Sequence, residues 1–131
     1  MGHHREELRV DGMAEPISHY TDAVRAGGLL FVSGIVPVDA DGKLVGAGDV
    51  VEQARQVFRN LDLVLRAGGC TFADVAKVTL FLLDVNDRAA INPVRQEFFG
   101  DARPASTLVE VSALAVPGAL LEIEAVAAIP S

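Results

Sequence analysis

Aromatic side chains are scarce in this sequence, which has no tryptophan, one tyrosine and six phenylalanines. Aromatic residues make up only 5% of the 131 residues, whereas half of the residues are hydrophobic. A chain of this length forms one domain and can bury a single core. We therefore expect a core built mainly from valine, leucine, alanine and isoleucine, with the phenylalanines as its larger members.

Cysteine occurs only once, at Cys70, which excludes an intrachain disulfide and fits a reducing compartment. We interpret Cys70 as a small apolar residue rather than a nucleophile. No apolar run approaches the roughly 18–20 residues that a membrane helix needs. The first ten residues are charged and lack the apolar segment of a signal peptide. The sequence thus predicts a cytoplasmic protein with no membrane partner.

Positive charge is also scarce, since eleven lysines and arginines stand against eighteen acidic residues and give a net charge of −7. Nucleic-acid affinity comes largely from cations that neutralise phosphates, so we expect no nucleic-acid partner. The sequence contains no metal-ligand spacing, no Ser/His/Asp or Cys/His arrangement and no glycine-rich phosphate loop. We therefore predict neither a metal nor an organic cofactor.

The pattern of the remaining residues predicts two helices. Residues 49–67 form the clearer one, because Asp49 can cap its start and Glu52 follows at the capping-box spacing. Its apolar residues recur at three- and four-residue intervals, which makes one buried stripe. Gly68-Gly69 can end this helix in the left-handed conformation.

The second predicted helix opens at Asn92-Pro93. Asn92 can cap its start, and Pro93 suits the first helical position because the N–H that it lacks has no partner there. Residues 87–90 are predicted as a separate helical turn before it.

Five stretches have the composition of β-strands, namely residues 20–26, 29–33, 75–83, 105–111 and 119–128. The continuous apolar run at 29–33 predicts a strand that is covered on both faces. Residues 1–15 are expected to be a loosely packed N-terminal arm, and residues 16–131 a single domain. The order of elements predicts an α+β sandwich, in which both helices lie on one face of a mixed sheet. Apolar residues alternate with Ser, Thr and Glu on the other face, so we expect a partner subunit to cover it.

Four segments carry a family resemblance: residues 103–111 (RPASTLVEV), residues 121–127 (LEIEAVA), residues 31–34 (FVSG), and Asn92 with Phe98-Phe99. Together they resemble the Rid family (RidA/YjgF, also called L-PSP endoribonuclease-like), over about residues 16–128. The resemblance implies a chorismate-mutase-like fold and a homotrimer with ligand clefts between neighbouring subunits. It also implies hydrolytic deamination of small enamines or imines.

The sequence departs from the family pattern at Ser106. Most imine-deaminating members carry Pro-Ala-Arg-Ser, and their arginine binds a substrate carboxylate through a planar, bidentate contact that serine cannot reproduce. A hydrogen bond to a charged group contributes about 1.5–3 kcal/mol, so losing it costs roughly 10- to 150-fold in binding or rate. Two compensations are open. The hydroxyls of Ser106 and Thr107 can form an uncharged anion pocket, or a guanidinium can reach the cleft from Arg103, Arg25 or Arg95.

Glu122 and Glu124 lie two residues apart on one strand, so their side chains share a face. One interpretation is a solvated strand face. The surrounding apolar residues favour another, in which a desolvated carboxyl has a raised pKa and acts as a general acid or orients water. By resemblance, Glu122 matches the catalytic glutamate of the family, whereas Glu124 is structural and suits a subunit interface.

The resemblance places Tyr20, Ser33, Gly34 and Asn92 in the cleft, and Ser106 with Thr107 at its polar end. The residues alone also allow plainer roles: a core aromatic for Tyr20, a strand-ending turn for Ser33-Gly34 and a helix cap for Asn92. A glycine lets a ligand approach the backbone closely, which favours the cleft role of Gly34.

His19 and Arg103 are further candidates for the site. A histidine side chain is suited to carrying a proton at physiological pH, which makes His19 a candidate, although an isolated histidine is more often a surface residue. Arg103 is the arginine closest in sequence to Ser106. Its alternative role is that of a solvated loop residue before Pro104.

The leading functional hypothesis is a deaminase of a small enamine or imine that bears a carboxylate. Residues 18–24 (SHYTDAV) and 103–107 (RPAST) resemble the 2-aminomuconate deaminase branch of the family and make 2-aminomuconate a candidate substrate. The alternative is a non-catalytic trimer that binds a small metabolite. Endoribonuclease activity is a third hypothesis, which the acidic net charge disfavours.

Overall fold

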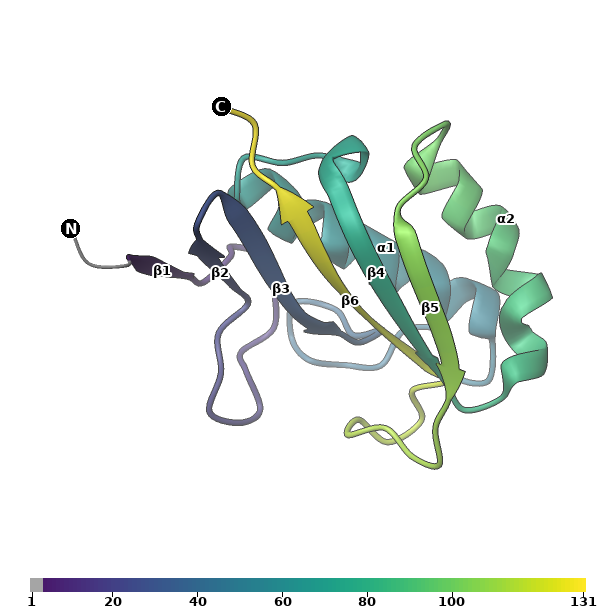
Figure 1. Ribbon diagram of the computed structural model, residues 1–131. Coiled ribbons are helices and arrows are strands. Elements are labelled where there is room, and N and C mark those ends of the chain that lie inside the picture. Colours follow the sequence, from purple (N-terminus) through teal and green to yellow (C-terminus); the bar gives the residue numbers. More distant parts are fainter. Residues whose placement is uncertain (1–3) are drawn as a thin grey trace.

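The computed structural model describes residues 4–131 and contains one mixed β-sheet with two helices packed on one of its faces (Figure 1). The helices are α1 (Val50–Ala67) and α2 (Arg88–Phe99). The six strands are β1 (Arg5–Leu8), β2 (Ala23–Ala26), β3 (Leu29–Ile35), β4 (Val75–Leu82), β5 (Ala105–Glu110) and β6 (Leu121–Ala128). The α+β architecture expected from the sequence is confirmed.

The last strand of the chain lies inside the sheet, whose order is β1-β2-β3-β6-β4-β5. Strand β6 pairs antiparallel with β3 on one side and with β4 on the other. Strands β4 and β5 are parallel, and α2 forms the crossover between them. Because β6 is central, it has a paired strand on each side, and its side chains point alternately to the two faces of the sheet.

Helix α1 agrees with its prediction. The Asp49 side chain accepts hydrogen bonds from the backbone N–H groups of Val51 and Glu52, each at 3.1 Å. Gly69, just beyond the helix, has φ +84°, the left-handed conformation that glycine adopts without strain. The face turned to the sheet is fully buried at Ala54, Val57, Phe58, Leu61, Val64 and Leu65.

Helix α2 starts earlier than predicted. A short 3-10 turn (Val85–Asp87), whose start is capped by Asp84, leads directly into the helix at Arg88. Pro93 therefore lies inside the helix, where it lacks the N–H that would bond to the carbonyl four residues before it. Asn92 is an exposed residue of the helix and does not cap it. The capping signal at Asp84 overrides the one at Asn92.

The N-terminal segment is more ordered than expected from residues 5 onward. Strand β1 pairs with β2, and the Thr21 hydroxyl donates a 2.7 Å hydrogen bond to the Leu8 carbonyl. The buried carboxylate of Asp22 accepts from the Val10 N–H at 2.8 Å and from the Arg9 side chain. The expectation of a loosely packed arm over residues 1–15 is therefore wrong for β1; residues 1–3 lie outside the described part.

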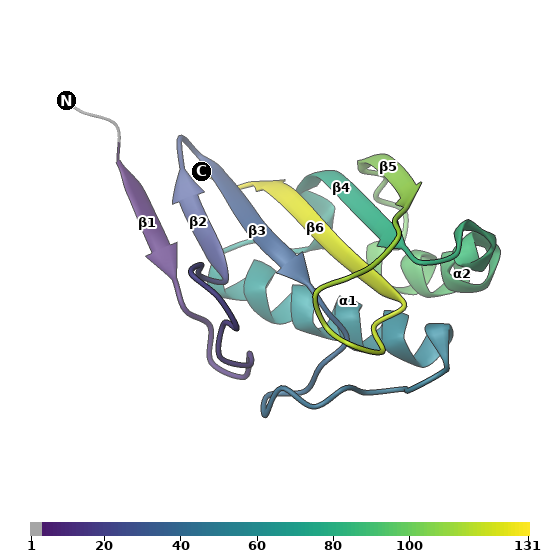
Figure 2. The ribbon, with the colours of Figure 1, turned by 90° about the horizontal axis from the view of Figure 1, so that it is seen from below.

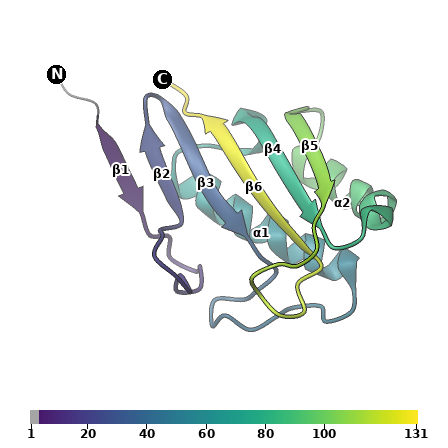
Figure 3. The same ribbon diagram turned by 60° about the horizontal axis from the view of Figure 1, so that its bottom comes forward.

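The second face of the sheet is uncovered in the single chain, as the two rotated views in Figure 2 and Figure 3 show. Leu30 and Val32 of β3 are buried under the helices, whereas Leu29 and Phe31 are 37% and 44% exposed on the other face. The prediction that residues 29–33 are covered on both faces does not hold within one chain.

Four of the other phenylalanines form an aromatic cluster between the helices: Phe58, Phe72, Phe98 and Phe99.

A fully buried glutamine connects α1 to the start of β6. The Gln53 amide nitrogen donates to the carbonyls of Gly46 and Gly118 at 3.2 and 3.0 Å. Its amide oxygen accepts from the Leu120 N–H at 2.7 Å. A buried polar backbone group needs such a partner, so Gln53 fixes where the central strand begins.

We expect Gln53→Leu to lower the free energy of unfolding by about 1–3 kcal/mol or more, because it leaves buried backbone groups without partners. Gln96→Leu is the matched control, since Gln96 is exposed on α2. Urea denaturation of both variants measures the difference. Equal unfolding midpoints for the two variants would contradict this role of Gln53.

Candidate functional site

The predicted site residues other than Thr107 fall into two groups on different sides of the sheet. His19, Tyr20, Ser33, Gly34 and Glu122 lie around the end of β3, and we call this group the Glu122 region. Asn92, Arg103 and Ser106 line a pocket between α2 and the edge strand β5, which we call the α2–β5 pocket.

The Glu122 region is built on a β-bulge. Strands β3 and β6 pair in regular register up to Val32 and Ala125, and pairing resumes at Ile35 and Ile123. Strand β3 thus has one extra residue in this interval, and Gly34 lies within it. A Cβ atom at Gly34 would lie 2.9 Å from Cδ of Glu122 and closer still to its Oε2 atom. The Glu122 carboxylate therefore packs directly over the Gly34 backbone, and a side chain at position 34 would have to displace it.

The Glu122 carboxyl is half-buried. Burial raises its pKa, and the nearby carboxylate of Glu124 on the same face raises it further. The raised pKa predicted from the apolar surroundings is thus confirmed in direction. Such a carboxyl can donate a proton or, once ionised, accept one within the range where enzymes operate.

Tyr20 and Ser33 extend the region beyond Gly34. Both line an open pocket of about 530 Å³ together with His19, and a small cavity of about 80 Å³ that Gly34 also lines. The Ser33 hydroxyl donates a 2.6 Å hydrogen bond to the Thr21 carbonyl. The Tyr20 side chain is 47% exposed, and its hydroxyl accepts a long bond from the Ile17 N–H at 3.4 Å. Tyr20 is thus a surface residue beside the bulge rather than a core aromatic.

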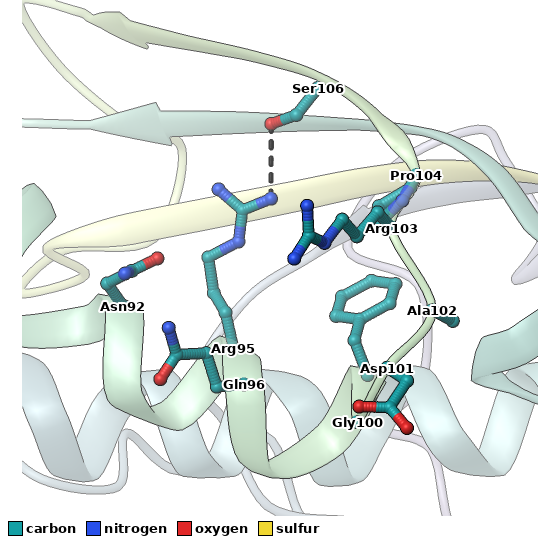
Figure 4. A pocket seen from close by; sticks show the side chains of 10 residues that line it. Asn92, Arg95, Gln96, Gly100, Asp101, Ala102, Arg103, Pro104 and Ser106 are labelled. Atoms are coloured by element: carbon teal, nitrogen blue, oxygen red, sulfur yellow. Dashed lines mark hydrogen bonds between the residues drawn. The ribbon is translucent and has the colours of Figure 1, made fainter.

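The α2–β5 pocket has a volume of about 700 Å³ and contains two guanidinium groups (Figure 4). Arg95 projects from α2 and donates from Nη2 to the Ser106 hydroxyl at 3.2 Å. Burial lowers the pKa of the Arg95 guanidinium. Arg103 enters from the segment before β5, and Asn92 lies three residues before Arg95 on the same helix.

In the sequence, Arg95 is only one of three arginines that can reach the site, with Arg25 and Arg103. The helical spacing from Asn92 is the signal that singles it out, since residues three apart lie on one helix face. Arg25, another of the three, is instead paired with Glu6.

Ser106 and Thr107 do not form the joint hydroxyl pocket that was considered from the sequence. Ser106 pairs with the buried Val78 and faces α2, whereas Thr107 pairs with Thr79 and faces the uncovered side of the sheet. The Thr107 hydroxyl accepts a 2.6 Å hydrogen bond from Lys77. Successive residues of a strand point to opposite faces, so one small ligand cannot contact both hydroxyls within one chain.

Other types of site find little support in residues 4–131. No group of three or more His, Cys, Asp or Glu side chains in that range is arranged to hold a metal ion. Among the described helices, none is both long and apolar enough to cross a bilayer. Cys70 is 2% exposed in the core, and burial raises the pKa of its thiol, which opposes a nucleophilic role.

Comparison with known proteins identifies the family. The family model described as Endoribonuclease L-PSP matches residues 12–129. The chain is 41% identical to a RutC family protein of Pyrococcus horikoshii, over 94% of this chain and 97% of that protein. It is 37% identical to the 3-aminoacrylate deaminase RutC of Acinetobacter baylyi, with the same coverage. A 2-iminobutanoate/2-iminopropanoate deaminase of Capra hircus is 40% identical, over 85% of this chain and 80% of that protein.

Solved structures agree with this result. A Rid family protein of Yersinia pestis superposes with a TM-score of 0.90 at 34% identity, covering 96% of this chain and 100% of that one. TdcF of E. coli, solved with bound serine, has a TM-score of 0.87 at 32% identity, covering 96% and 99%. The chain belongs to the Endoribonuclease L-PSP family, which is the Rid family that its motifs resemble.

The raised pKa of Glu122 leads to a test of stability against pH. Burial favours the protonated form of Glu122 more in the folded state than in the unfolded chain. The stability that this difference contributes is fully present below the pKa of an unfolded glutamate, about 4.3, and is lost as the pH rises through the folded-state pKa. We expect the stability of Glu122→Gln relative to the wild type to increase between pH 4 and pH 8. Urea midpoints across this range measure the trend, and a relative stability that falls with pH would contradict it.

Proposed function

We propose that this protein catalyses the hydrolytic deamination of a small enamine or imine, with 2-aminomuconate as the candidate substrate. The observation that carries the proposal is the half-buried carboxyl of Glu122, with its raised pKa, held over the backbone of Gly34. Relatives that are 37–40% identical over most of the chain are named as deaminases of 3-aminoacrylate and of 2-iminobutanoate.

In the proposed reaction, the enamine first tautomerises to an imine. Water adds to the imine carbon while the nitrogen gains a proton, and the resulting carbinolamine breaks its C–N bond to give a carbonyl group and ammonia. The net change is the addition of one water and the loss of one ammonia. Glu122 donates a proton to nitrogen in its acid form and accepts one from water in its ionised form, which a pKa shifted toward neutrality favours.

The remaining predicted residues have binding roles in this proposal. Gly34 leaves room for the ligand and the carboxyl, and Tyr20 and Ser33 form the wall beside them. Asn92 and Ser106 belong to the polar end of the cleft, on the side of α2. Thr107, on the uncovered face, contacts a neighbouring subunit or the ligand bound by that neighbouring subunit. His19 is a candidate proton carrier at the rim of the cleft.

We also propose that the cleft is shared between subunits of a homotrimer. Glu122 and Ser106 lie on opposite faces of the sheet and on strands β6 and β5, which are two strand spacings or about 10 Å apart. A small substrate that contacts both therefore needs Glu122 from one chain and Ser106 from another. The uncovered face, with the exposed Phe31, offers the apolar surface for such an assembly.

A binding protein without catalysis is the second candidate. Ser106 favours it, because the arginine that binds a substrate carboxylate in the resembling deaminases is missing from this position. TdcF, a structural neighbour, was solved with bound serine. In this alternative the cleft is retained and Glu122 contributes only a hydrogen bond to the ligand.

The assembly is tested by Phe31→Glu, which places a charge on the uncovered face. We expect the wild type to sediment at three times the 13.8 kDa chain mass, and the variant to dissociate because the charge would be buried. Leu63→Glu, on the exposed side of α1, is the control that should remain assembled. A wild type that sediments as a single chain would contradict the shared cleft.

The reaction is tested by ammonia release from 2-aminomuconate generated in situ, with 2-aminoacrylate in parallel. Glu122→Gln should reduce turnover by roughly 10²–10⁴-fold, the usual contribution of general acid–base catalysis. Full turnover in this variant would refute the role of Glu122. Stabilisation of the wild type by small acids, with no ammonia released from either substrate, would favour the binding protein.

A further inference from the structure

Two arginines of the α2–β5 pocket have no carboxylate partner within residues 4–131. Five of the nine arginines of the chain form ion pairs there, but Arg95 and Arg103 form none. Both side chains line the same pocket of about 700 Å³, a size typical of small-ligand sites. Guanidinium groups directed into a pocket without a counterion are suited to bind an anionic ligand.

The orientation of Arg95 is set by Ser106. The 3.2 Å bond from its Nη2 atom to the Ser106 hydroxyl connects the helix to the edge strand. A guanidinium group has five N–H donors in a planar fork, so this single bond leaves others for a ligand. Burial also removes part of the water around Arg95 and lowers its pKa, and a bound carboxylate would compensate for that loss.

The short side chain at position 106 is what allows this arrangement. An arginine there would project from the helix-facing side of β5 into the space that the Arg95 guanidinium now occupies (Figure 4). Serine instead leaves that space open and provides a hydroxyl that accepts from Arg95.

We infer that Arg95, oriented by Ser106, binds a carboxylate of the ligand, so that the cation of the anion subsite comes from helix α2 instead of residue 106. The inference rests on the proposed function, since it concerns the substrate end of the same cleft.

Arg103 extends the inference to the class of ligand. Two guanidinium groups in one pocket match a dicarboxylate better than a monocarboxylate, because each can neutralise one anionic group. Asp101 is the acidic residue in the lining, and its carboxylate lies at the opposite end of the pocket from the two guanidinium groups in Figure 4. The favoured ligand is therefore a small unsaturated dicarboxylate.

Calorimetric titration with muconate, an unreactive dicarboxylate, and with sorbate, its monocarboxylate counterpart, tests both steps. We expect the wild type to bind muconate more tightly than sorbate. Arg95→Gln should weaken muconate binding by roughly 10- to 150-fold, and Arg95→Lys should weaken it less because it keeps the charge without the fork. Arg103→Gln should weaken the binding of muconate while leaving the affinity for sorbate unchanged.

Arg88→Gln is the matched control, since Arg88 is an exposed arginine at the start of the same helix. Its affinity for muconate should equal that of the wild type, and thermal unfolding midpoints verify that each variant is folded. An unchanged affinity in folded Arg95→Gln, or a wild type that does not bind muconate, would overturn the inference.

The outcome separates this subsite from the proposed reaction. If no enamine yields ammonia but Arg95→Gln still lowers the affinity for muconate, the proposed reaction is refuted and the subsite stands. If Arg95→Gln retains wild-type affinity and an unchanged KM while ammonia release still depends on Glu122, the subsite is refuted and the reaction stands.

Discussion

The contact between the Glu122 carboxylate and the Gly34 backbone is the constraint on which the account of this protein depends. It requires β6 to lie in the middle of the sheet, a bulge in β3 opposite it and a residue without a side chain in that bulge. Burial of the carboxyl in this arrangement raises its pKa, and the neighbouring Glu124 raises it further. The buried amide of Gln53 supports the same strand by fixing the segment that leads into it.

The sheet keeps the acidic and basic parts of the site apart. Glu122 lies on the uncovered face, where burial and Glu124 favour its protonated form. Arg95 and Arg103 lie on the other side, in the pocket between α2 and the edge strand β5, and neither forms an ion pair with Glu122 within residues 4–131. A cleft shared between subunits would bring the proton donor of one chain and the cationic subsite of another to the same substrate. Glu122 and the arginines would each keep the environment that their own chain provides.

Local patterns predicted much of this structure. The stripe and caps of α1, the alternation along β6 and the apolar neighbours of Glu122 are short-range signals, and each was confirmed. The start of α2 was wrong because Asn92-Pro93 and Asp84 give competing signals that only the folded chain decides. Strand β1 was missed because its charged residues resemble a free arm, although they pair with β2.

Relations between elements could not be predicted in the same way. The joint Ser106 and Thr107 pocket, one of the two alternatives considered from the sequence, neglected the alternation of a strand, which sends the two hydroxyls to Arg95 and to Lys77. The hydrogen bond between Arg95 and Ser106 depends on how closely α2 lies to β5, and no sequence spacing gives that distance. Contacts across the uncovered face depend on a second chain and lie beyond any local pattern.

The turnover of Gly34→Ala shows whether catalysis depends on the contact between Glu122 and Gly34. The added methyl group would clash with the end of a flexible side chain and not with backbone, so the fold should persist while the Glu122 carboxylate is displaced. We expect a folded protein whose ammonia release falls toward that of Glu122→Gln. Wild-type turnover in folded Gly34→Ala would contradict the claim that catalysis depends on the carboxylate held over this glycine.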